Sequence, residues 1–232
     1  MYKKIILKLS GESLGKQGQG ISFKDVDRII AEIKPLAGKG ISLGIIVGGG
    51  NIWRGSEHGG NLIKSTDSDY VGMTATLING LVLRSRFAKH KISAALFSSF
   101  PVGNYIEQFT LEKVAAAWKD KKIVIMVGGT GRPHFTTDTG AAVFAVETSS
   151  EVVLKATDVD GVYDKDPNKD ATARLIKRIS FDEVIKRNLK VMDMSAFSIC
   201  RHHGIKIVVF NFNKKGNILR AASGLSVGSL IL

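Results

Sequence analysis

The sequence of 232 residues contains a single cysteine, Cys200, which excludes an intrachain disulfide. Cys200 follows Ala196 and Ile199 at helical spacing, so we expect a packing role for its thiol rather than a chemical one. No apolar run approaches the roughly 20 residues that cross a bilayer. Residues 1–9 are too short for a signal peptide and predict a first strand. We therefore expect a cytoplasmic protein with no membrane partner.

Several signatures of known catalytic sites are also missing. The sequence has no GxxxxGK[ST] phosphate loop, no GxGxxG dinucleotide turn, no HRD or DFG motif of protein kinases and no GxSxG nucleophile elbow. No cluster of cysteines and histidines predicts a metal site. The adjacent His202 and His203 point in different directions on one predicted helix, so we expect neither to be functional. The remaining features are glycine turns, hydroxyls and a few charged residues, which are the groups that position and neutralise phosphates.

Acidic residues are outnumbered by basic ones. The 33 lysines and arginines against 21 aspartates and glutamates give a formal net charge of +12. A basic protein gains affinity for polyanions by releasing counterions, so nucleic-acid binding is one hypothesis. The basic residues are scattered, however, and the densest groups, at 119–122 and 213–215, are not interleaved with stacking aromatic side chains. A solvated basic surface, or attraction for anionic nucleotides, is the more economical explanation, and we expect no nucleic-acid partner.

The order of apolar segments predicts an α/β fold with parallel strands. Residues 3–9 and 43–47 predict buried strands, and residues 22–36, with Ser22 as the N-cap, predict the helix that connects them. The longest predicted helix covers 67–89, with an apolar stripe through Tyr70, Met73, Leu77, Ile78, Leu81 and Phe87. Further strands are expected at 92–97, 123–127, 151–155, 205–210 and 229–231, with helices at 111–118, 136–147, 180–188 and 193–203. The 44% content of hydrophobic residues suits one globular domain.

Glycine-rich turns follow several predicted strands. We expect residues 48–50 to adopt backbone conformations that other residues resist. Residues 51–54 begin like a short helix, whose positive terminus would attract an anion to the glycine amides; a tight turn without a ligand is the alternative. Residues 128–133 predict a second phosphate cradle at the carboxyl end of a strand. Lys8 ends the first strand, where a buried lysine needs an acidic partner or a phosphate.

Four motifs of the chain stand out together: KLSGE at 8–12, GGGNIWRG at 48–55, GTGRPHFTTD at 129–138 and LKATDVDGVYDKDP at 154–167. Together they resemble the motifs of the bacterial UMP kinases in the amino acid kinase superfamily. The resemblance spans nearly the whole chain in the order of the family, and it includes LKVMD at 189–193 and VFNFNKKG at 209–216.

The resemblance implies a three-layer α/β/α fold with a mostly parallel central sheet. It implies a single domain, 1–232, with a phosphate-acceptor half at about 1–150 and an ATP-binding half at about 151–232. The implied reaction is transfer of the γ-phosphoryl group of ATP to UMP, with Mg²⁺ accompanying ATP, in pyrimidine nucleotide biosynthesis. A homohexamer and feedback inhibition by UTP are also implied.

The resemblance also assigns roles to individual residues. Catalysis falls to Lys8 and Lys155, which neutralise phosphate charge, and to Asp138, which orients the two lysines. The implied ATP-binding residues are Lys8, Leu9, Ser10, Gly11, Gly50, Arg54, Thr157, Tyr163 and Asp166. The implied UMP-binding residues are Gly49, Asp69, Thr130, Gly131, Arg132, Pro133, His134, Phe135, Thr136 and Thr137.

Each role has a structural alternative. Asp69 and Asp138 could act only as acidic residues at helix N-termini, where such charges stabilise by roughly 0.3–1 kcal/mol. Lys8 could belong to a structural ion pair, although Lys155 ends its own strand in the same way, which suggests a shared anion. The remaining alternatives are helix caps for Thr136 and Thr137, a loop anchor for Tyr163 and an Asp-Pro turn for Asp166.

Two other functions stay open at this point. A superfamily kinase that acts on a carboxylate or a carbamate should lack GTGxPxFTTD, and a nucleic-acid-binding regulator is supported by charge alone. One segment also departs from the family pattern: residues 11–20 are about one residue shorter than usual and lack an aromatic residue. Because that loop takes part in GTP activation in many members, we expect GTP activation to be weak or absent.

Overall fold

The computed structural model describes residues 2–16, 18–55, 63–189 and 191–232. Its strands are β1 (Lys4–Leu9), β2 (Ser42–Val47), β3 (Ala94–Ser98), β4 (Glu107–Gln108), β5 (Ile123–Val127), β6 (Val152–Thr157), β9 (Arg178–Ile179), β10 (Lys206–Asn211) and β11 (Ser229–Ile231), with a separate hairpin of β7 (Val162–Tyr163) and β8 (Leu175–Ile176). The nine-stranded sheet has the order β4-β3-β5-β2-β1-β6-β10-β11-β9. Its pairs are parallel apart from β10 with β11.

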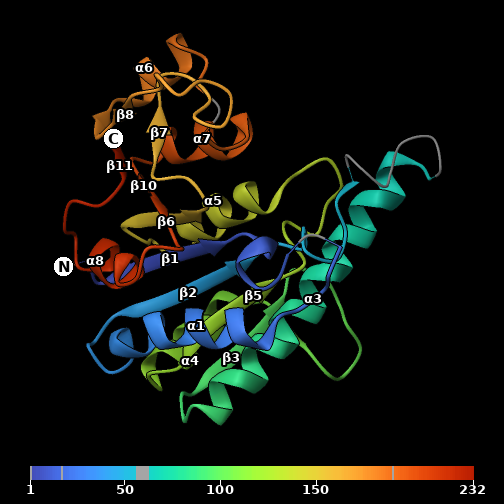
Figure 1. Ribbon diagram of the computed structural model, residues 1–232. Helices are drawn as coiled ribbons and strands as arrows, with labels where there is room; N and C mark the ends of the chain where they lie inside the picture. Colours follow the sequence, from blue (N-terminus) through green and yellow to red (C-terminus); the bar gives the residue numbers. More distant parts are fainter. Residues whose placement is uncertain (1, 17, 56–62, 190) are drawn as a thin grey trace.

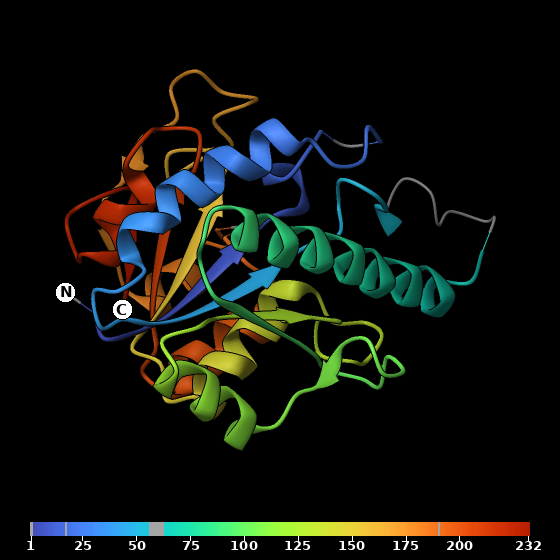
Figure 2. The same cartoon turned by 90° about the horizontal axis from the view of Figure 1, so that it is seen from below.

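Helices cover both faces of this sheet (Figures 1 and 2). One apolar cluster joins the sheet to α1 (Phe23–Ile33), α3 (Ser65–Lys89) and α8 (Asn217–Ala222). A second cluster joins the opposite face to α4 (Leu111–Lys119), α5 (Thr137–Glu147), α6 (Phe181–Lys186) and α7 (Met194–His202). Short 3₁₀ turns lie at Gly11–Ser13 and Lys34–Leu36. The predicted three-layer α/β/α fold is therefore confirmed.

Alternation along the two central strands explains where their lysines point. In β1 the odd-numbered residues pack on the α1 and α3 side, whereas Ile6 packs on the α5 side. Because side chains alternate along a strand, Lys8 lies on the same side as Ile6. Val153 of β6 also packs on the α5 side, so Lys155 lies there too. The parallel register pairs Lys8 with Lys155, which places both lysines side by side at the carboxyl ends of their strands.

Side-chain caps begin several helices where the sequence predicts them. Ser22 Oγ accepts from Asp25 N at 3.3 Å at the start of α1. Thr136 Oγ1 accepts from Asp138 N at 3.0 Å at the start of α5. Each cap satisfies one of the backbone amides that a helix N-terminus leaves without an intrahelical partner. The cap of α5 also fixes the position of Asp138 in the first turn of the helix.

The predicted apolar stripe of α3 is partly wrong. Tyr70 and Ile78 are 47% and 45% exposed, whereas Met73, Leu77 and Phe87 are buried and Leu81 is half-buried. The buried face also contains small and polar residues, namely Ser68, Ala75, Thr76, Asn79 and Gly80. The sequence pattern misled because Ala75, Thr76 and Asn79 contact the two glycine turns, residues 48–50 and 128–131, which need close approach and hydrogen bonds rather than apolar cover.

The turn after β2 also differs from expectation. Residues 51–54 form no helix, because Ile52 N and Trp53 N both donate to Gly49 O at 2.9 Å in a turn. Residues 48–50 are also absent from the left-handed region of backbone conformation. Proximity requires glycine at Gly49 and at its neighbour Gly11: a Cβ on Gly49 would lie 2.7 Å from Gly72 O, and a Cβ on Gly11 would lie 2.5 Å from Gly50 N. A Cβ on Gly50 would meet nothing closer than Arg54 Nη2, at 3.5 Å.

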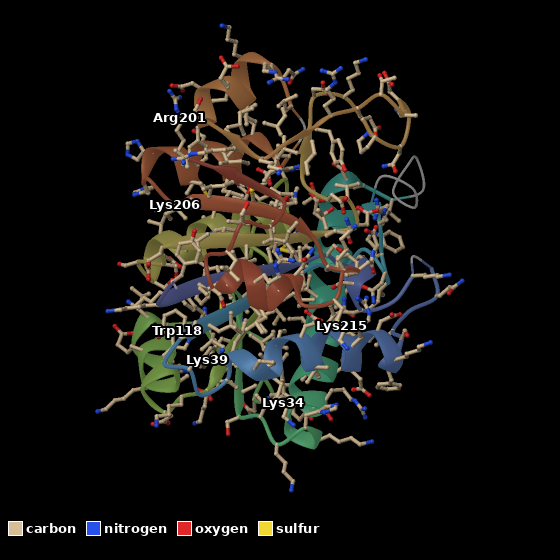
Figure 3. The ribbon with its side chains drawn as sticks, turned by 60° about the vertical axis from the view of Figure 1, so that its left-hand side comes forward. Lys34, Lys39, Trp118, Arg201, Lys206 and Lys215 are labelled. Carbon is tan, nitrogen blue, oxygen red and sulfur yellow. The ribbon has the colours of Figure 1, made fainter. Side chains whose placement is uncertain are left out.

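The single cysteine and the basic surface follow the sequence analysis. Cys200 is fully buried, and burial raises the pKa of its thiol to about 12, so the thiol is unreactive. Figure 3 shows basic side chains pointing outward from several different elements, among them Lys34, Lys39, Arg201, Lys206 and Lys215. Among the described residues, no helix combines the length and the apolar character that crossing a membrane requires.

Two helical glycines of α3 provide a test of packing. A Cβ on Gly80 would lie 2.3 Å from Val127 Cγ1, whereas a Cβ on Gly72 would meet only Trp53 Cδ1, at 3.8 Å. Both Gly→Ala changes gain up to about 1 kcal/mol of helix propensity. We expect Gly72→Ala to stabilise the protein and Gly80→Ala to destabilise it by about 1–3 kcal/mol through overpacking. Urea unfolding of the two variants measures both effects, and equal stabilisation by both would contradict the packing described.

Candidate active site

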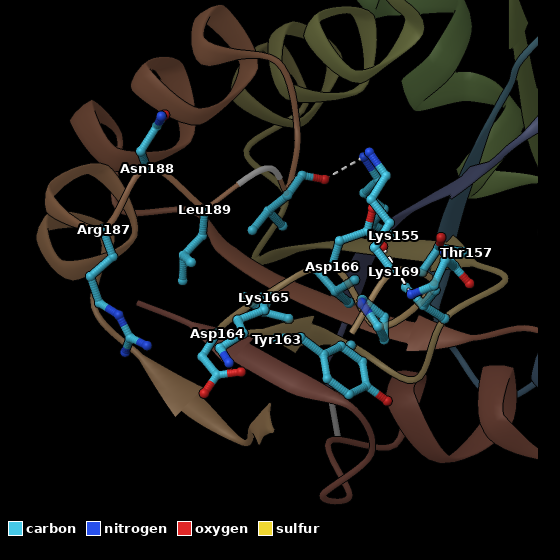
Figure 4. Close-up of a pocket in the computed structure, with 17 residues that line it drawn as sticks. Lys155, Thr157, Tyr163, Asp164, Lys165, Asp166, Lys169, Arg187, Asn188 and Leu189 are labelled. Carbon is cyan, nitrogen blue, oxygen red and sulfur yellow. Dashed lines mark hydrogen bonds between the residues drawn. The ribbon is translucent and has the colours of Figure 1, made fainter. Parts of the chain in front are cut away.

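Two lysines and one aspartate meet at the carboxyl ends of β1 and β6. Lys8 Nζ lies 2.8 Å from Asp138 Oδ1, and Lys155 Nζ donates to Asp138 Oδ2 at 2.5 Å. Lys155 Nζ also donates to Val191 O at 2.6 Å, a bond drawn in Figure 4. The side chains of all three residues are 15% exposed or less. We call this group the lysine–aspartate triad.

The pKa values in the triad reflect burial and mutual charge. Burial raises the pKa of Asp138, but the charges of Lys8 and Lys155 outweigh it and lower this pKa to about 2. Burial lowers the pKa of Lys155. The negative charge of Asp138 raises this pKa, and the positive charge of Lys8 lowers it further. Asp138 is therefore ionised at neutral pH, and one carboxylate serves two lysines. An additional anion beside the triad would relieve the remaining repulsion between the lysines.

A cavity of about 400 Å³ opens on one side of the triad. We call it the Lys8 cavity; its walls come from the turn after β1, the turn after β2, the first turns of α3 and the start of α5. The lining residues are Lys8, Ser10, Gly11, Glu12, Gly48, Gly49, Gly50, Trp53, Arg54, Gly55, Ser68, Asp69, Gly72, Met73, Thr76, Gly129, Phe135, Thr136 and Thr137. Arg54 forms an ion pair with Glu12 at its edge.

A second cavity, of about 590 Å³, opens at Lys155. We call it the Lys155 cavity, and Figure 4 shows Tyr163, Asp166 and Lys169 among the residues that line it. Its lining residues are Lys155, Thr157, Val159, Gly161, Val162, Tyr163, Asp164, Lys165, Asp166, Pro167, Asn168, Lys169, Arg187, Asn188, Leu189, Val191 and Val209. One lysine of the triad thus lines each cavity, and Asp138 lies between the two lysines.

The residues predicted to bind ATP are divided between the two cavities. Thr157, Tyr163 and Asp166 line the Lys155 cavity. Asp166 Oδ1 also accepts from Asn168 N at 3.0 Å, so it organises its own turn as well. The members that line the Lys8 cavity are Lys8, Ser10, Gly11, Gly50 and Arg54. Leu9 lines neither cavity, because its side chain is fully buried in the apolar core on the other face of the sheet.

The residues predicted to bind UMP are only partly brought together. Gly49, Asp69, Phe135, Thr136 and Thr137 line the Lys8 cavity. Thr130, Gly131, Arg132, Pro133 and His134 are outside its lining. Within this outer loop Thr130 Oγ1 accepts from Arg132 N at 3.2 Å, and His134 N donates to Asp69 Oδ2 at 2.8 Å. The loop therefore contacts the cavity through Asp69.

The second glycine turn, residues 128–131 after β5, has an unusual backbone conformation. Gly128, Gly129 and Gly131 all have positive φ, at 83°, 57° and 72°. Such angles strain residues that carry a Cβ, so glycine is required here by conformation. Gly129 also packs against α5, since a Cβ on Gly140 would lie 3.1 Å from Gly129 C. The turn holds its backbone close to the cavity wall and to the first turn of α5.

Several residues of the site escaped the sequence analysis. Asp193 caps α7 by accepting from Ala196 N at 2.8 Å, and it binds the hydroxyls of Thr136 and Thr139. It lies in the LKVMD segment, which could have directed attention to it. Trp53, whose Nε1 donates to Ser68 Oγ at 3.0 Å, lies in the GGGNIWRG segment. Thr76 gave no sequence signal, because a threonine inside a long helix is unremarkable.

Among the described residues, no group of protein side chains forms a metal centre at this site. Across residues 2–16, 18–55, 63–189 and 191–232, no three histidine, cysteine, aspartate or glutamate side chains gather closely enough to hold a metal ion. Asp138 is already engaged by two lysines, and the carboxylates that line the two cavities, Glu12, Asp69, Asp164 and Asp166, belong to no such group.

Comparisons of this chain with a family model, with named proteins and with solved structures agree with one another. The family described as "Amino acid kinase family" matches residues 3–211. The uridylate kinases of Haemophilus influenzae (strain 86-028NP) and Fervidobacterium nodosum are 41% and 42% identical over 232 and 233 residues; each alignment covers all of this chain and 98% or 99% of the relative. The crystal structure of UMP kinase from Ureaplasma parvum has a TM-score of 0.93 at 31% identity and covers 100% of this chain and 99% of its own. That of UMP kinase from Bacillus anthracis has a TM-score of 0.94 at 32% identity, with 99% and 96% covered.

The low pKa of Asp138 predicts how the stability of the fold depends on pH. Because this pKa falls from 3.8 to about 2 on folding, the ionised form contributes about 2 kcal/mol above pH 4, and this contribution disappears as pH falls toward 2. We expect the Asp138→Asn variant to lose less free energy of unfolding than the wild type between pH 5 and pH 2. Urea unfolding at several pH values measures the difference.

The exposed aspartate Asp182, whose side chain is 74% exposed, provides the matched control. Asp182→Asn should follow the wild-type curve across the same pH range. If the free energy of unfolding of Asp138→Asn also falls in parallel with that of the wild type between pH 5 and pH 2, the lysines do not hold Asp138 in its ionised form.

Proposed function

The chain belongs to the amino acid kinase family, and we propose on that premise that it transfers the γ-phosphoryl group of ATP to UMP, yielding UDP and ADP. It is an ATP-dependent nucleoside monophosphate kinase. The observation that carries this assignment is the pair of cavities that meet at Lys8, Asp138 and Lys155. Two nucleotides can lie there with their phosphates directed toward the same two lysines.

ATP occupies the Lys155 cavity in this proposal. The cavity is the larger of the two, and it lies within the part of the chain after residue 150, which we assign to the donor. Tyr163 offers an aromatic wall, and Thr157 and Asp166 offer polar groups for the nucleoside. The triphosphate then extends past Lys155 toward Lys8, where Ser10, Gly11, Gly50 and Arg54 surround the terminal phosphate.

UMP occupies the Lys8 cavity, all of whose lining residues come before residue 150. Asp69 accepts from the ribose while it also holds His134 N. Thr136 and Thr137, at the first turn of α5, face the phosphate and the base. The positive end of the α5 dipole favours negative charge in this position. Gly49 and Phe135 complete the wall beside them.

The chemistry needs no covalent nucleophile. An oxygen of the UMP phosphate attacks the γ-phosphorus in line, and the new P–O bond forms as the bond to the bridging oxygen of ADP breaks. Lys8 and Lys155 neutralise charge that collects on the transferring group and on the leaving oxygen. Asp138, with its pKa near 2, stays ionised and fixes both ammonium groups instead of accepting a proton. The triad therefore acts by position and charge.

Mg²⁺ enters with ATP as part of the donor substrate. The described residues offer no group of three metal ligands, which suits an ion held mainly by phosphate oxygens and water. The ion supplies charge neutralisation, which adds to that of the two lysines.

We extend the proposal to assembly and regulation. Exposed apolar side chains on α3, among them Tyr70, Val71 and Ile78, support a homohexamer in which this helix lies at a contact between copies. UTP carries the same base and ribose as UMP, which supports inhibition by UTP. Because both substrates are metabolites of the cytoplasm, we place the reaction there.

The two competing functions have less support. A kinase for a carboxylate or carbamate has no use for the second glycine turn and the Asp69–His134 contact, which enclose a cavity large enough for a nucleotide. Nucleic-acid binding would need a continuous basic surface, whereas the basic side chains are distributed over many elements (Figure 3). The weak GTP response expected from the short loop at 11–20 stays a prediction, and residue 17 of this loop lies outside the described residues.

We expect Lys8→Ala to lower kcat by at least about 10²-fold, because it removes a cation from the transferring phosphate. The fold should survive, since Asp138 keeps Lys155 as its partner. The measurements are kcat with ATP, UMP and Mg²⁺, and the melting temperature, with the exposed Lys34→Ala as the matched control. A large loss of stability with undiminished activity in the folded fraction would make Lys8 a purely structural ion-pair residue.

The acceptor itself is tested by comparing nucleoside monophosphates. UMP should be phosphorylated far more efficiently than CMP, AMP or GMP, because polar groups left unpaired in a buried site can reject a base by up to roughly 10⁴. CMP is the most stringent competitor, since cytosine reverses the donor and acceptor pattern of uracil at two adjacent atoms. The measurement is kcat/KM for each acceptor. Comparable values for UMP and CMP, or turnover of an amino acid or carbamate, would refute the assignment.

A further inference from the structure

Two buried asparagines beside the first glycine turn, residues 48–50 after β2, are joined to each other by hydrogen bonds. Asn51 Nδ2 donates to Asn79 Oδ1 at 3.1 Å, and Asn79 Nδ2 donates to Asn51 Oδ1 at 2.8 Å. The second amide hydrogen of Asn51 goes to Gly20 O at 3.1 Å, and that of Asn79 goes to Gly48 O at 2.8 Å. Both side chains are 0% exposed. Every amide hydrogen of the pair therefore has an acceptor.

Thr76, one turn before Asn79 on α3, makes the corresponding contact with the second glycine turn. Its Oγ1 accepts from Gly128 N at 2.7 Å and donates to Met73 O at 2.6 Å, and the residue is 1% exposed. Residues three apart share one face of a helix. A single face of α3 thus binds Gly48 at the end of β2 and Gly128 at the end of β5.

We propose that Asn79 and Thr76 are positioning residues, through which α3 fixes the two glycine turns relative to each other and to the acceptor phosphate. The inference rests on the proposed acceptor site in the Lys8 cavity. Gly48 and Gly129 line that cavity. Neither Asn79 nor the Thr76 hydroxyl is needed to react with a substrate, because both act through the backbone groups that they hold.

Burial of these polar groups supports a role beyond cohesion of the fold. An apolar residue at position 79 would pack against the sheet without desolvating an amide, but it would leave Gly48 O and Asn51 Nδ2 without this partner. A satisfied buried network specifies one arrangement of the groups it joins, whereas apolar contact tolerates small shifts. The turns need such precision, because displacement of a substrate by about 1 Å can cost about 10² in rate.

The test uses Asn79→Ala and Thr76→Val, the second of which keeps the shape of the side chain while removing its hydroxyl. Thr148→Val is the matched control: Thr148 is also buried, at 6% exposure, and its Oγ1 bonds to Phe144 O at 2.6 Å, but it lines neither cavity. For each variant, kcat and KM are measured for UMP and for ATP, together with the melting temperature.

We expect kcat/KM for UMP to fall about tenfold or more in both α3 variants. The KM for ATP should change by less than the KM for UMP, because no residue of α3 lines the Lys155 cavity, in which the nucleoside of ATP is proposed to lie. Thr148→Val should lower the melting temperature to a similar extent while kcat/KM for UMP stays at the wild-type value. If Asn79→Ala does not fold, Thr76→Val alone decides the question.

Unchanged kcat/KM for UMP in the folded α3 variants would overturn the inference. So would an equal loss in the control, or a parallel rise in the KM for ATP, because each would indicate general destabilisation. Wild-type turnover of UMP is measured first. Its absence would refute the proposed function, whereas normal wild-type turnover with unaffected variants would refute only the role of α3.

Discussion

The attraction between one buried carboxylate and two lysines is the constraint on which the site depends. Asp138 comes from α5, whereas Lys8 and Lys155 come from neighbouring strands. Two ammonium groups this close repel each other, and burial adds a desolvation cost for each charge. The carboxylate relieves both effects, so the strands, the helix and the cap at Thr136 must all be in place before the lysines can coexist. In the proposed function, the same excess of positive charge attracts the phosphates of the substrates.

The glycine turns meet a different constraint. After β5 the backbone takes positive φ angles, whereas after β2 the glycines allow backbone to approach backbone. Gly11 and Gly49 lie so close to other main chain that no Cβ would fit at either position without displacement. One turn is therefore specified by conformation and the other by packing, and both contribute backbone to the wall of the Lys8 cavity.

Much of the fold and part of the site could be predicted from the sequence. The lysines at strand ends were identifiable because a charged residue interrupts an apolar run, and alternation along the strands determines the side on which they lie. The reason for the glycines at 48–50 was not predictable, since sequence does not distinguish a need for positive φ from a need for space. Thr76 and Asn79 were also missed, because hydrogen bonds to backbone groups of distant turns leave no periodic pattern. The loop at 130–134 showed the limit of motif matching: a shared motif does not place every member in the cavity.

The seam between β1 and β6 has a consequence for how the protein acquires activity during synthesis. The strand order places β4, β3, β5, β2 and β1 on one side of this seam and β6, β10, β11 and β9 on the other. Lys8 is made early, whereas its register partner Lys155 is made only after more than half of the chain has been completed. The strands up to β5 can thus pair while the ribosome is still extending the chain, but the second lysine arrives with the later, long-range pairing of β6 with β1. A chain that ends before β6 consequently lacks Lys155 and leaves Asp138 with Lys8 as its one partner within the triad.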